Sequence, residues 1–284
     1  MVAYSWVQPY LPAWANVGAQ VAALTTPDAP EVAYPTYGSV ELVTYLEAHL
    51  IAQTDSIDVT RWTTREGFDS VEDAITEALI QNPYVYANGG QWRDTGARVK
   101  YEPFYRYSEG DAEHRRAVTR QAIEQGLLDS GAATAATAAE KVTAIHDYIV
   151  AIADYDYTAY DLITAGAIDG ARVDQSQEAY GIFAAGTAVC NGYAQAFLAM
   201  AEAAGLDAVQ VTGTVSSGMT VGNHAWNKVL VDGRWLVVDT TWDDPLPGEA
   251  PQREYLMIPS NSPLLVTRVE DADWVVDTNI GAFA

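Results

Sequence analysis

One cysteine, one histidine and one aspartate in the second half of the chain have the types expected of a nucleophile, its base and a group that orients the base. Cys190 is the only cysteine among the 284 residues, and His224 and Asp239 follow it. In such a set the imidazole takes the proton of the thiol, while the carboxylate fixes the imidazole tautomer and stabilises the imidazolium. The chemistry that these side chains could perform is nucleophilic attack on an acyl group.

Cys190 is expected in the first turn of a helix. Large apolar and small residues recur after it at helical steps: Tyr193, Phe197, Met200 and Ala204. Gly205 is a typical helix end, and a strand is expected over 206–214. Unpaired backbone N–H groups and the helix dipole would favour a thiolate at Cys190. The alternative is a small buried hydrophobic residue, which most free cysteines are.

His224 and Asp239 are expected on one face of a β-hairpin. Two strand-like runs flank Asp232-Gly233, a dipeptide that favours a two-residue type I′ turn. In that register Trp226 faces Asp239, so His224 lies one diagonal step away on the same face. Diagonal neighbours are about 7–8 Å apart at the backbone, within reach of long side chains. The register alone therefore predicts a hydrogen bond between the imidazole and the carboxylate.

The segments VCNGYA, NHAWNKVLVDGRWLVVDTTWDDP and KVTAIHDYIVAIADYDY together resemble the transglutaminase-like superfamily of cysteine proteases and acyltransferases. The resemblance covers about residues 136–260. It implies a papain-like α+β core, in which the nucleophile helix packs on an antiparallel sheet, with Cys190 as nucleophile, His224 as base and Asp239 as orienter. It also implies that Tyr180 could lend its hydroxyl to the oxyanion, although packing is an equal alternative. The backbone N–H of Cys190 is the other expected oxyanion donor.

Further residues near these motifs are expected to complete the cleft. Trp242 should wall the site and Trp226 should pack beside the imidazole, although both could instead roof a tunnel for an amine acceptor. Asp243 and Asp244 are expected to cap a helix or form a turn. His146 is expected to be a core histidine with its polar atoms satisfied, because nothing acidic or metal-binding is spaced to join it.

The composition excludes several classes of partner. The chain has 38 acidic and 15 basic residues and a net charge of −23, which repels phosphate backbones and anionic lipid, so we expect no nucleic-acid or membrane-surface partner. No run is long enough to span a bilayer. The spacing of cysteine and histidine does not fit a zinc site, and residues 154–161 lack the pattern of a calcium loop. We therefore expect catalysis without a metal or organic cofactor.

Three regions are expected along the chain: a proline-rich irregular lead over 1–36, a smaller α+β helper over 37–130 and the catalytic domain over 131–284. The helper should contain helices over 39–53 and 70–80, the second capped by Ser70, and strands over 57–64, 83–87 and 96–107. A helix over 111–128 follows. The capping-box pattern of Thr137 and Glu140 then predicts a helix that carries His146. A last edge strand is expected over 255–258.

Three classes of function remain open: a thiol hydrolase of peptide or other amide bonds, a transglutaminase-type acyltransferase that joins glutamine to amines, and a non-catalytic surface-binding module. The complete set of Cys190, His224 and Asp239 favours an enzyme, and we expect hydrolysis. We expect a bacterial cysteine hydrolase acting on a protein or peptide. It should be an extracellular, cell-surface or cell-wall protein whose leader lies outside these residues. A cytoplasmic location stays open, and the sequence does not indicate an oligomeric state.

Overall fold

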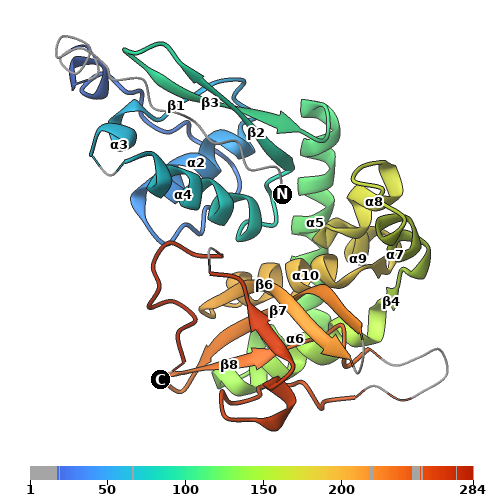
Figure 1. Cartoon of the computed structure of the whole chain (residues 1–284). Coiled ribbons are helices and arrows are strands. Elements are labelled where there is room, and N and C mark those ends of the chain that lie inside the picture. Colours follow the sequence, from blue (N-terminus) through green and yellow to red (C-terminus); the bar gives the residue numbers. More distant parts are fainter. Residues whose placement is uncertain are drawn as a thin grey trace.

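The computed structural model describes residues 18, 20–65, 67–217, 220–244, 250, 252–272 and 274–283. Within them the chain forms a smaller N-terminal α+β unit and a larger α+β unit, with helix α5 (Glu109–Asp129) running along their boundary (Figure 1). Residues 1–17 of the expected lead lie outside the described residues. Residues 20–23 are helical, so the lead is not irregular throughout.

The N-terminal unit is built on an antiparallel sheet in the order β1-β3-β2. Its strands are β1 (Ile57–Asp58), β2 (Ala87–Asp94) and β3 (Val99–Tyr105), and its helices are α2 (Glu41–Ile51), α3 (Thr60–Arg65) and α4 (Phe68–Ile80). Helix α2 confirms the helix expected over 39–53. Leu42, Leu46 and Leu50 recur every four residues on it and are at most 2% exposed, which gives the helix one buried face.

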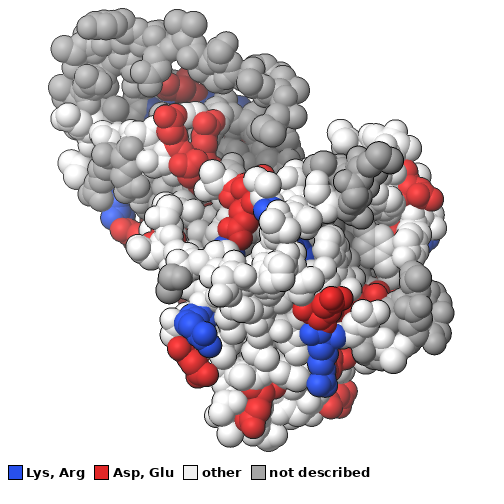
Figure 2. Space-filling view, turned by 60° about the horizontal axis from the view of Figure 1, so that its bottom comes forward, with Lys and Arg blue, Asp and Glu red and all other residues white. Residues whose placement is uncertain are grey.

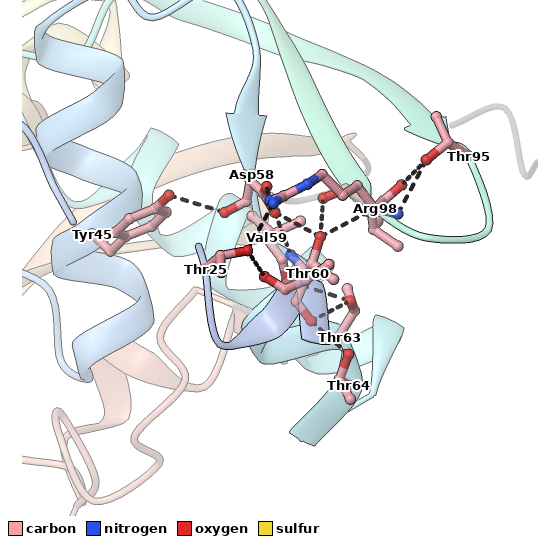
Figure 3. A network of polar contacts seen from close by, with 11 residues as sticks. Thr25, Tyr45, Asp58, Val59, Thr60, Thr63, Thr64, Thr95 and Arg98 are labelled. Carbon is pink, nitrogen blue, oxygen red and sulfur yellow. Dashed lines mark hydrogen bonds and ion pairs between the residues drawn. The ribbon is translucent and has the colours of Figure 1, made fainter. Parts of the chain in front are cut away.

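The strand expected over 57–64 is wrong beyond Asp58. One carboxylate oxygen of Asp58 accepts hydrogen bonds from the backbone N–H (3.0 Å) and the hydroxyl (2.6 Å) of Thr60, and this local turn starts α3. The other oxygen pairs with Arg98, which directly precedes β3, and Arg98 also donates to the Thr25 hydroxyl at 2.8 Å (Figure 3). Asp58 therefore ends a strand and ties the lead segment to the sheet.

Two further boundaries in this unit differ from expectation. Helix α4 begins after Gly67, whose φ of 95° only glycine adopts readily, so Ser70 lies inside the first turn and is not the cap. Of the strand expected over 83–87, only Ala87 is in a strand. Residues 83–84 form a turn, because the side chain and the carbonyl of Asn82 accept hydrogen bonds from the N–H groups of Tyr84 and Val85. Strand β2 begins only at Ala87.

The larger unit is built on a four-stranded antiparallel sheet in the order β8-β7-β6-β9. The strands are β6 (Ala208–Ser217), β7 (Thr220–Val231), β8 (Arg234–Val238) and β9 (Arg268–Glu270). Helix α10 (Cys190–Ala203) packs against β6 and β7 and crosses behind the sheet in Figure 1. Tyr193, Phe197 and Met200 on its apolar face are 0% exposed. The expected α+β class, with a nucleophile helix on an antiparallel sheet, is confirmed.

Helices surround α10 on its other sides. They are α5, α6 (Ala138–Ile152) and α9 (Ala179–Ala185), with α7 (Tyr157–Thr164) and α8 (Ala171–Ser176) further out. Strands β4 (Asp154–Tyr155) and β5 (Thr187–Ala188) pair in parallel, and two 3₁₀ turns, η1 (Ala132–Thr134) and η2 (Pro263–Leu265), complete the described elements. The capping box of Thr137 and Glu140 at the start of α6 is confirmed. The domain boundary at 130/131 stays a prediction, because α5 itself packs on α6, α9 and α10.

The N-terminal unit covers an edge of the larger sheet. Beyond the short strand β9, the side chain of Gln81 takes the place of a neighbouring strand along β6. Its amide donates to the carbonyl of Gln210 at 2.7 Å and accepts from the Gln210 N–H at 2.8 Å. It also donates to the Trp274 carbonyl at 2.9 Å. One buried amide thus satisfies backbone groups that a free strand edge would leave unpaired.

The surface carries the acidic excess of the sequence. Acidic side chains are spread over the face shown in Figure 2 and do not gather in one patch. No helix in the described part of the chain is long and apolar enough to cross a membrane.

Candidate active site

The hairpin that carries His224 has the expected turn and register. Asp232 and Gly233 have φ values of 51° and 76°, both left-handed, as a type I′ turn requires. Val231 pairs with Arg234, and the pairing between β7 and β8 continues from there toward His224. His224 Nε2 lies 2.7 Å from Asp239 Oδ2. The predicted contact between imidazole and carboxylate is therefore confirmed.

Asp239 lies just beyond β8 and is 1% exposed. Its Oδ1 accepts the Trp242 backbone N–H at 3.1 Å, and its Oδ2 accepts from Arg268 Nη2 at 2.7 Å as well as facing His224. Burial alone would raise the pKa of this carboxyl, but the charges and hydrogen bonds of His224 and Arg268 outweigh burial and lower it. Asp239 is held as a carboxylate.

His224 joins this carboxylate to the thiol of Cys190. Burial alone would lower the pKa of His224, but the charge and hydrogen bond of Asp239, assisted by a hydrogen bond with Cys190, raise it to about 9. Because Nε2 faces Asp239, the nitrogen left for the thiol is Nδ1. The geometry favours an imidazolium beside the sulfur at neutral pH.

Cys190 is the first residue of α10, as expected, and it is partly exposed. Its backbone N–H forms no hydrogen bond with a described residue, whereas Gly192 and Tyr193 already donate to the carbonyl of Val189. The N–H of Cys190 is thus available to a negatively charged oxygen at the helix start.

Two indole rings enclose the imidazole. The ring centroid of His224 lies 5.8 Å from that of Trp226 and 5.5 Å from that of Trp242, with interplanar angles of 26° and 33°. Trp226 is 1% exposed and packs beside the imidazole, as expected. Trp242 is half-buried and lines a pocket together with His224, and its role in a substrate cleft stays a prediction.

The pocket beside His224 has a volume of ≈ 410 Å³. Its described lining is acidic and aromatic: Asp154, Tyr155, Tyr157, His224, Thr241, Trp242 and Asp244. The hydroxyl of Tyr193 donates to Asp244 at 2.6 Å. Burial raises the pKa of Asp244 to about 6, and the nearby charge of Asp154 adds to this shift. Neither carboxylate forms an ion pair with a described lysine or arginine.

A scan against family models matches residues 125–240 to the transglutaminase-like superfamily. The matched stretch contains Cys190, His224 and Asp239, which the structure brings together. Residues 125–240 form a transglutaminase-like domain.

Curated relatives match a shorter part of this domain. Kyphoscoliosis peptidase of Mus musculus is 41% identical over 61 residues, and its Homo sapiens counterpart is 39% identical over 61 residues. Each match covers 19% of this chain and 9% of the relative, so the chain spans a small part of their length.

Two solved structures show a lower similarity. A crystal structure of a TGase has 16% identity and a TM-score of 0.39, covering 60% of this chain and 48% of that chain. A candidate cysteine protease from Cytophaga hutchinsonii has 17% identity and a TM-score of 0.36, covering 54% of this chain and 41% of that chain.

Tyr180 lies on α9, where the guanidinium of Arg115 sits over its ring at 4.4 Å. Arg115 also pairs with Glu178 at 3.1 Å. The ring of Tyr180 is therefore packed against Arg115. A role of the Tyr180 hydroxyl as an oxyanion donor stays a prediction.

His146 is fully buried, as expected of a core histidine, but the expectation that nothing acidic joins it is wrong. Its Nε2 lies 2.9 Å from Asp243 Oδ2 and its Nδ1 lies 3.1 Å from Asp147 Oδ1. Asp243 also accepts the backbone N–H of Tyr255. The group is therefore a tether between α6 and the loop that carries Trp242. The contact between His146 and Asp243 could not be predicted from the sequence, because the two residues are far apart along the chain.

The edge strand expected over 255–258 is present only in part. Val237 and Ile258 form an isolated antiparallel bridge, and the Asp239 N–H donates to the Tyr255 carbonyl at 3.0 Å. The segment runs beside β8 without forming a continuous strand.

Sequence reasoning missed Arg268, the cation that binds Asp239. It lies on the three-residue strand β9, outside the matched stretch and in a tail without a recognisable motif. A single arginine among apolar and polar residues does not indicate a functional site. Arg268 reaches the site only because β9 pairs with β6.

A buried chain of amides behind Cys190 was also missed. Asn191 donates to the Gln177 carbonyl at 2.7 Å and accepts from Gln210 at 2.6 Å. Gln210 in turn accepts from Gln195 at 2.6 Å, and Gln195 donates to the Ile80 carbonyl at 2.5 Å. The residue after the nucleophile is thus fixed to the sheet and, through it, to the N-terminal unit.

The described residues contain no group of three or more histidine, cysteine, aspartate or glutamate side chains arranged to hold a metal ion.

Proposed function

We propose that this protein is a thiol-dependent hydrolase that cleaves amide or peptide bonds through Cys190, His224 and Asp239. The observation that carries the proposal is the position of His224. Its imidazole lies between the thiol at the start of α10 and a buried carboxylate 2.7 Å away, and it lines a pocket large enough for a side chain. The curated relatives of the domain are named peptidases, which agrees with hydrolysis.

In the acylation step the Cys190 thiolate attacks the carbonyl carbon of the substrate. The backbone N–H of Cys190 donates a hydrogen bond to the carbonyl oxygen as it becomes negative, when such a bond is strongest. The imidazolium of His224 gives the Nδ1 proton to the departing amine as the C–N bond breaks, which leaves a thioester on Cys190. Throughout this step Asp239 stays ionised and holds the ring through Nε2.

In the deacylation step His224 acts as a base toward water. The ring takes a proton from the water molecule, whose oxygen attacks the thioester carbonyl. The C–S bond breaks, a carboxylic acid leaves, and the thiolate–imidazolium pair is restored.

The same thioester could instead react with an amine, which would make the protein an acyltransferase. Water is the better-supported acceptor, because the two indoles that might roof an amine tunnel already have other contacts. Trp226 is buried between His224 and Arg268, and Trp242 packs on the same two residues. A binding module without catalysis has less support, since Cys190 is partly exposed and lies beside His224.

The decisive experiment measures the reactivity of Cys190 toward iodoacetamide from pH 5 to pH 10, with the labelled residue mapped by mass spectrometry. We expect alkylation at pH 7 to be about 100-fold slower in His224→Ala than in the wild type, the size of effect typical for loss of a catalytic base. His114→Ala, which removes an exposed histidine on α5, is the matched control and should behave like the wild type. Equal, slow rates in all three proteins would contradict the proposal.

A second assay identifies the acceptor. The protein is incubated with a peptide library and, separately, with a glutamine-containing protein and a labelled primary amine. We expect peptide cleavage that disappears in Cys190→Ala. Cys190-dependent amine incorporation without cleavage would establish the acyltransferase instead.

A further inference from the structure

Arg268 is a buried cation at the back of the candidate site. Its side chain is 3% exposed, and its Nη2 lies 2.7 Å from Asp239 Oδ2. Three aromatic rings surround the guanidinium carbon, with centroids 4.4 Å (Trp242), 4.9 Å (Trp226) and 5.3 Å (Tyr255) away. Two of these rings are the same indoles that enclose His224.

The environment of Arg268 is costly for a charged side chain. Its Nε and Nη1 are buried and have no hydrogen-bond partner among the described residues. Unsatisfied buried donors cost free energy, which the contacts with aromatic faces offset only in part. An apolar side chain would pack among three aromatic rings without that cost. The benefit of a guanidinium here must therefore come from its contact with Asp239.

The fold provides a dedicated place for this residue. Strand β9 pairs with β6, with Arg268 opposite Val215 and Glu270 opposite Gly213. A Cβ at Gly213 would overlap the carbonyl oxygen of Val269, so the glycine is what lets β9 approach. Because β9 lies outside residues 125–240, the cation is an addition to the stretch that matches the family model.

One carboxylate oxygen serves two cationic groups. Asp239 Oδ2 faces both His224 Nε2 and Arg268 Nη2, each at 2.7 Å. The other ionisable side chains nearby are Cys190 on the far side of the imidazole, Tyr255, whose ring faces the guanidinium, and Asp154 and Asp244, which line the same pocket as His224. Arg268 therefore stabilises the carboxylate form and at the same time takes a share of the charge that attracts the imidazolium.

We infer that Arg268 is a positioning residue that fixes the Asp239 carboxylate against His224 and limits how strongly this carboxylate stabilises the imidazolium. The inference rests on the proposed function for its catalytic meaning, but the electrostatic effect exists whether or not the chain turns over a substrate.

The sign of the expected effect follows from the shared oxygen. Removing the positive charge of Arg268 leaves all of the Asp239 charge to the imidazolium, so the pKa of His224 rises above its value of about 9. We expect a rise of roughly one pH unit in Arg268→Met, at the low end of the shifts that one close charge produces. Arg268→Gln keeps a hydrogen-bond donor but loses the charge, and should show a similar rise. Arg268→Lys keeps the charge and should stay close to the wild type.

The test is an NMR titration of the His224 ring in the whole chain, with its signal assigned through a His224→Gln variant. Wild type, Arg268→Met, Arg268→Gln and Arg268→Lys are compared, and near-UV circular dichroism checks that each is folded. Methionine suits the aromatic surroundings of Arg268, and the remaining Asp239 contacts with His224 and Trp242 persist, so we expect Arg268→Met to fold.

A rise in the pKa of His224 in the methionine and glutamine variants, without one in the lysine variant, supports the inference. No shift, a downward shift, or an equal shift in Arg268→Lys overturns it, since each shows that the charge of Arg268 is not shared through Asp239. The same four proteins are then alkylated with iodoacetamide across the pH range. If wild-type Cys190 proves unreactive, the proposed function fails, while the NMR result still decides the role of Arg268.

Discussion

At the scale of single residues, the site depends on which groups share the charge of one buried carboxylate. Asp239 accepts from the imidazole, from a guanidinium and from a backbone N–H. The pKa of His224 follows from this, because burial would lower it and the carboxylate outweighs burial. The protonation state of the imidazole therefore depends on Asp239 more than on any other group.

Replacing Asp239 with asparagine removes this charge while keeping the size of the side chain. We expect the pKa of His224 to fall, so that the imidazolium is lost at lower pH and the upper limit of the pH range of hydrolysis moves down. At pH 8 we expect kcat/KM to drop by about 100-fold or more, because the amide cannot stabilise the imidazolium. Asp161→Asn, on the exposed face of α7, is the control. An unchanged pH profile in Asp239→Asn would remove Asp239 from the mechanism.

How far the sequence predicts the site depends on how each residue is brought to it. The contact of His224 with Asp239 could be predicted, because a two-residue turn fixes the register of a hairpin whose strands are neighbours in the chain. Arg268 could not, since it reaches Asp239 through a three-residue strand that joins the sheet on the far side of β6. Asp243 was missed for the same reason, because it reaches His146 from a distant part of the chain, whereas Asp147 directly follows His146 and was overlooked.

At the scale of elements, the nucleophile helix is fixed at its start by side-chain amides. Gln210 on β6 uses its backbone to bind Gln81 and its side chain to bind Asn191 and Gln195. Such a network stabilises one arrangement only while each member has its partner. Since Asn191 directly follows Cys190, the network also sets where the thiol lies.

Replacing Gln210 with glutamate tests this network with almost no change of shape. The carboxylate can still accept from Gln195, but it cannot donate to Asn191, so two acceptor oxygens then face each other. We expect the free energy of unfolding to fall by about 1–3 kcal/mol at pH 7, the cost of a broken buried hydrogen bond, measured by urea denaturation. Gln121→Glu, on the exposed face of α5, is the matched control. Equal stability of both variants would show that the amide chain does not hold α10.

Elements were predictable where periodicity was strong and local turn chemistry was simple. The helices α2, α6 and α10 follow apolar repeats with recognisable ends, and the structure confirms them. The strand predicted over 57–64 is wrong after Asp58. The prediction used only the alternation of polar and apolar residues, whereas the side chain of Asp58 binds Thr60 and turns the backbone into α3.

At the scale of the whole molecule, the two units are joined by contacts that no local pattern reveals. Gln81 and Gln210 are far apart in sequence, and each looks like an ordinary polar residue of a helix end and of a strand. Only the folded structure shows that the side chain of Gln81 pairs with the backbone of Gln210 at the edge of β6. The fold of the transglutaminase-like domain could be expected from its motifs, whereas the docking of the N-terminal unit could not.

Under the proposed function, we expect the net charge of −23 and the acidic pocket together to influence which substrates approach the site. The overall charge acts at long range and attracts any cation, but it is screened within about 8 Å at physiological salt. Asp154 and Asp244 act at short range inside the pocket, where a bound side chain would touch them. High salt therefore separates the two effects, because it screens the long-range attraction of the net charge and leaves much of the short-range attraction of Asp154 and Asp244.

We expect peptides with lysine or arginine near the scissile bond to be cleaved faster than matched peptides with norleucine or citrulline. The advantage in kcat/KM should be up to about fivefold, as for a partly exposed ion pair. Part of this advantage should persist at 0.5 M salt and disappear in Asp244→Asn, with Asp161→Asn as control. It should also fade as pH drops through about 6, since Asp244 then becomes neutral. If the preference vanishes at high salt and survives in Asp244→Asn, the diffuse charge of the molecule, and not the pocket, selects the substrate.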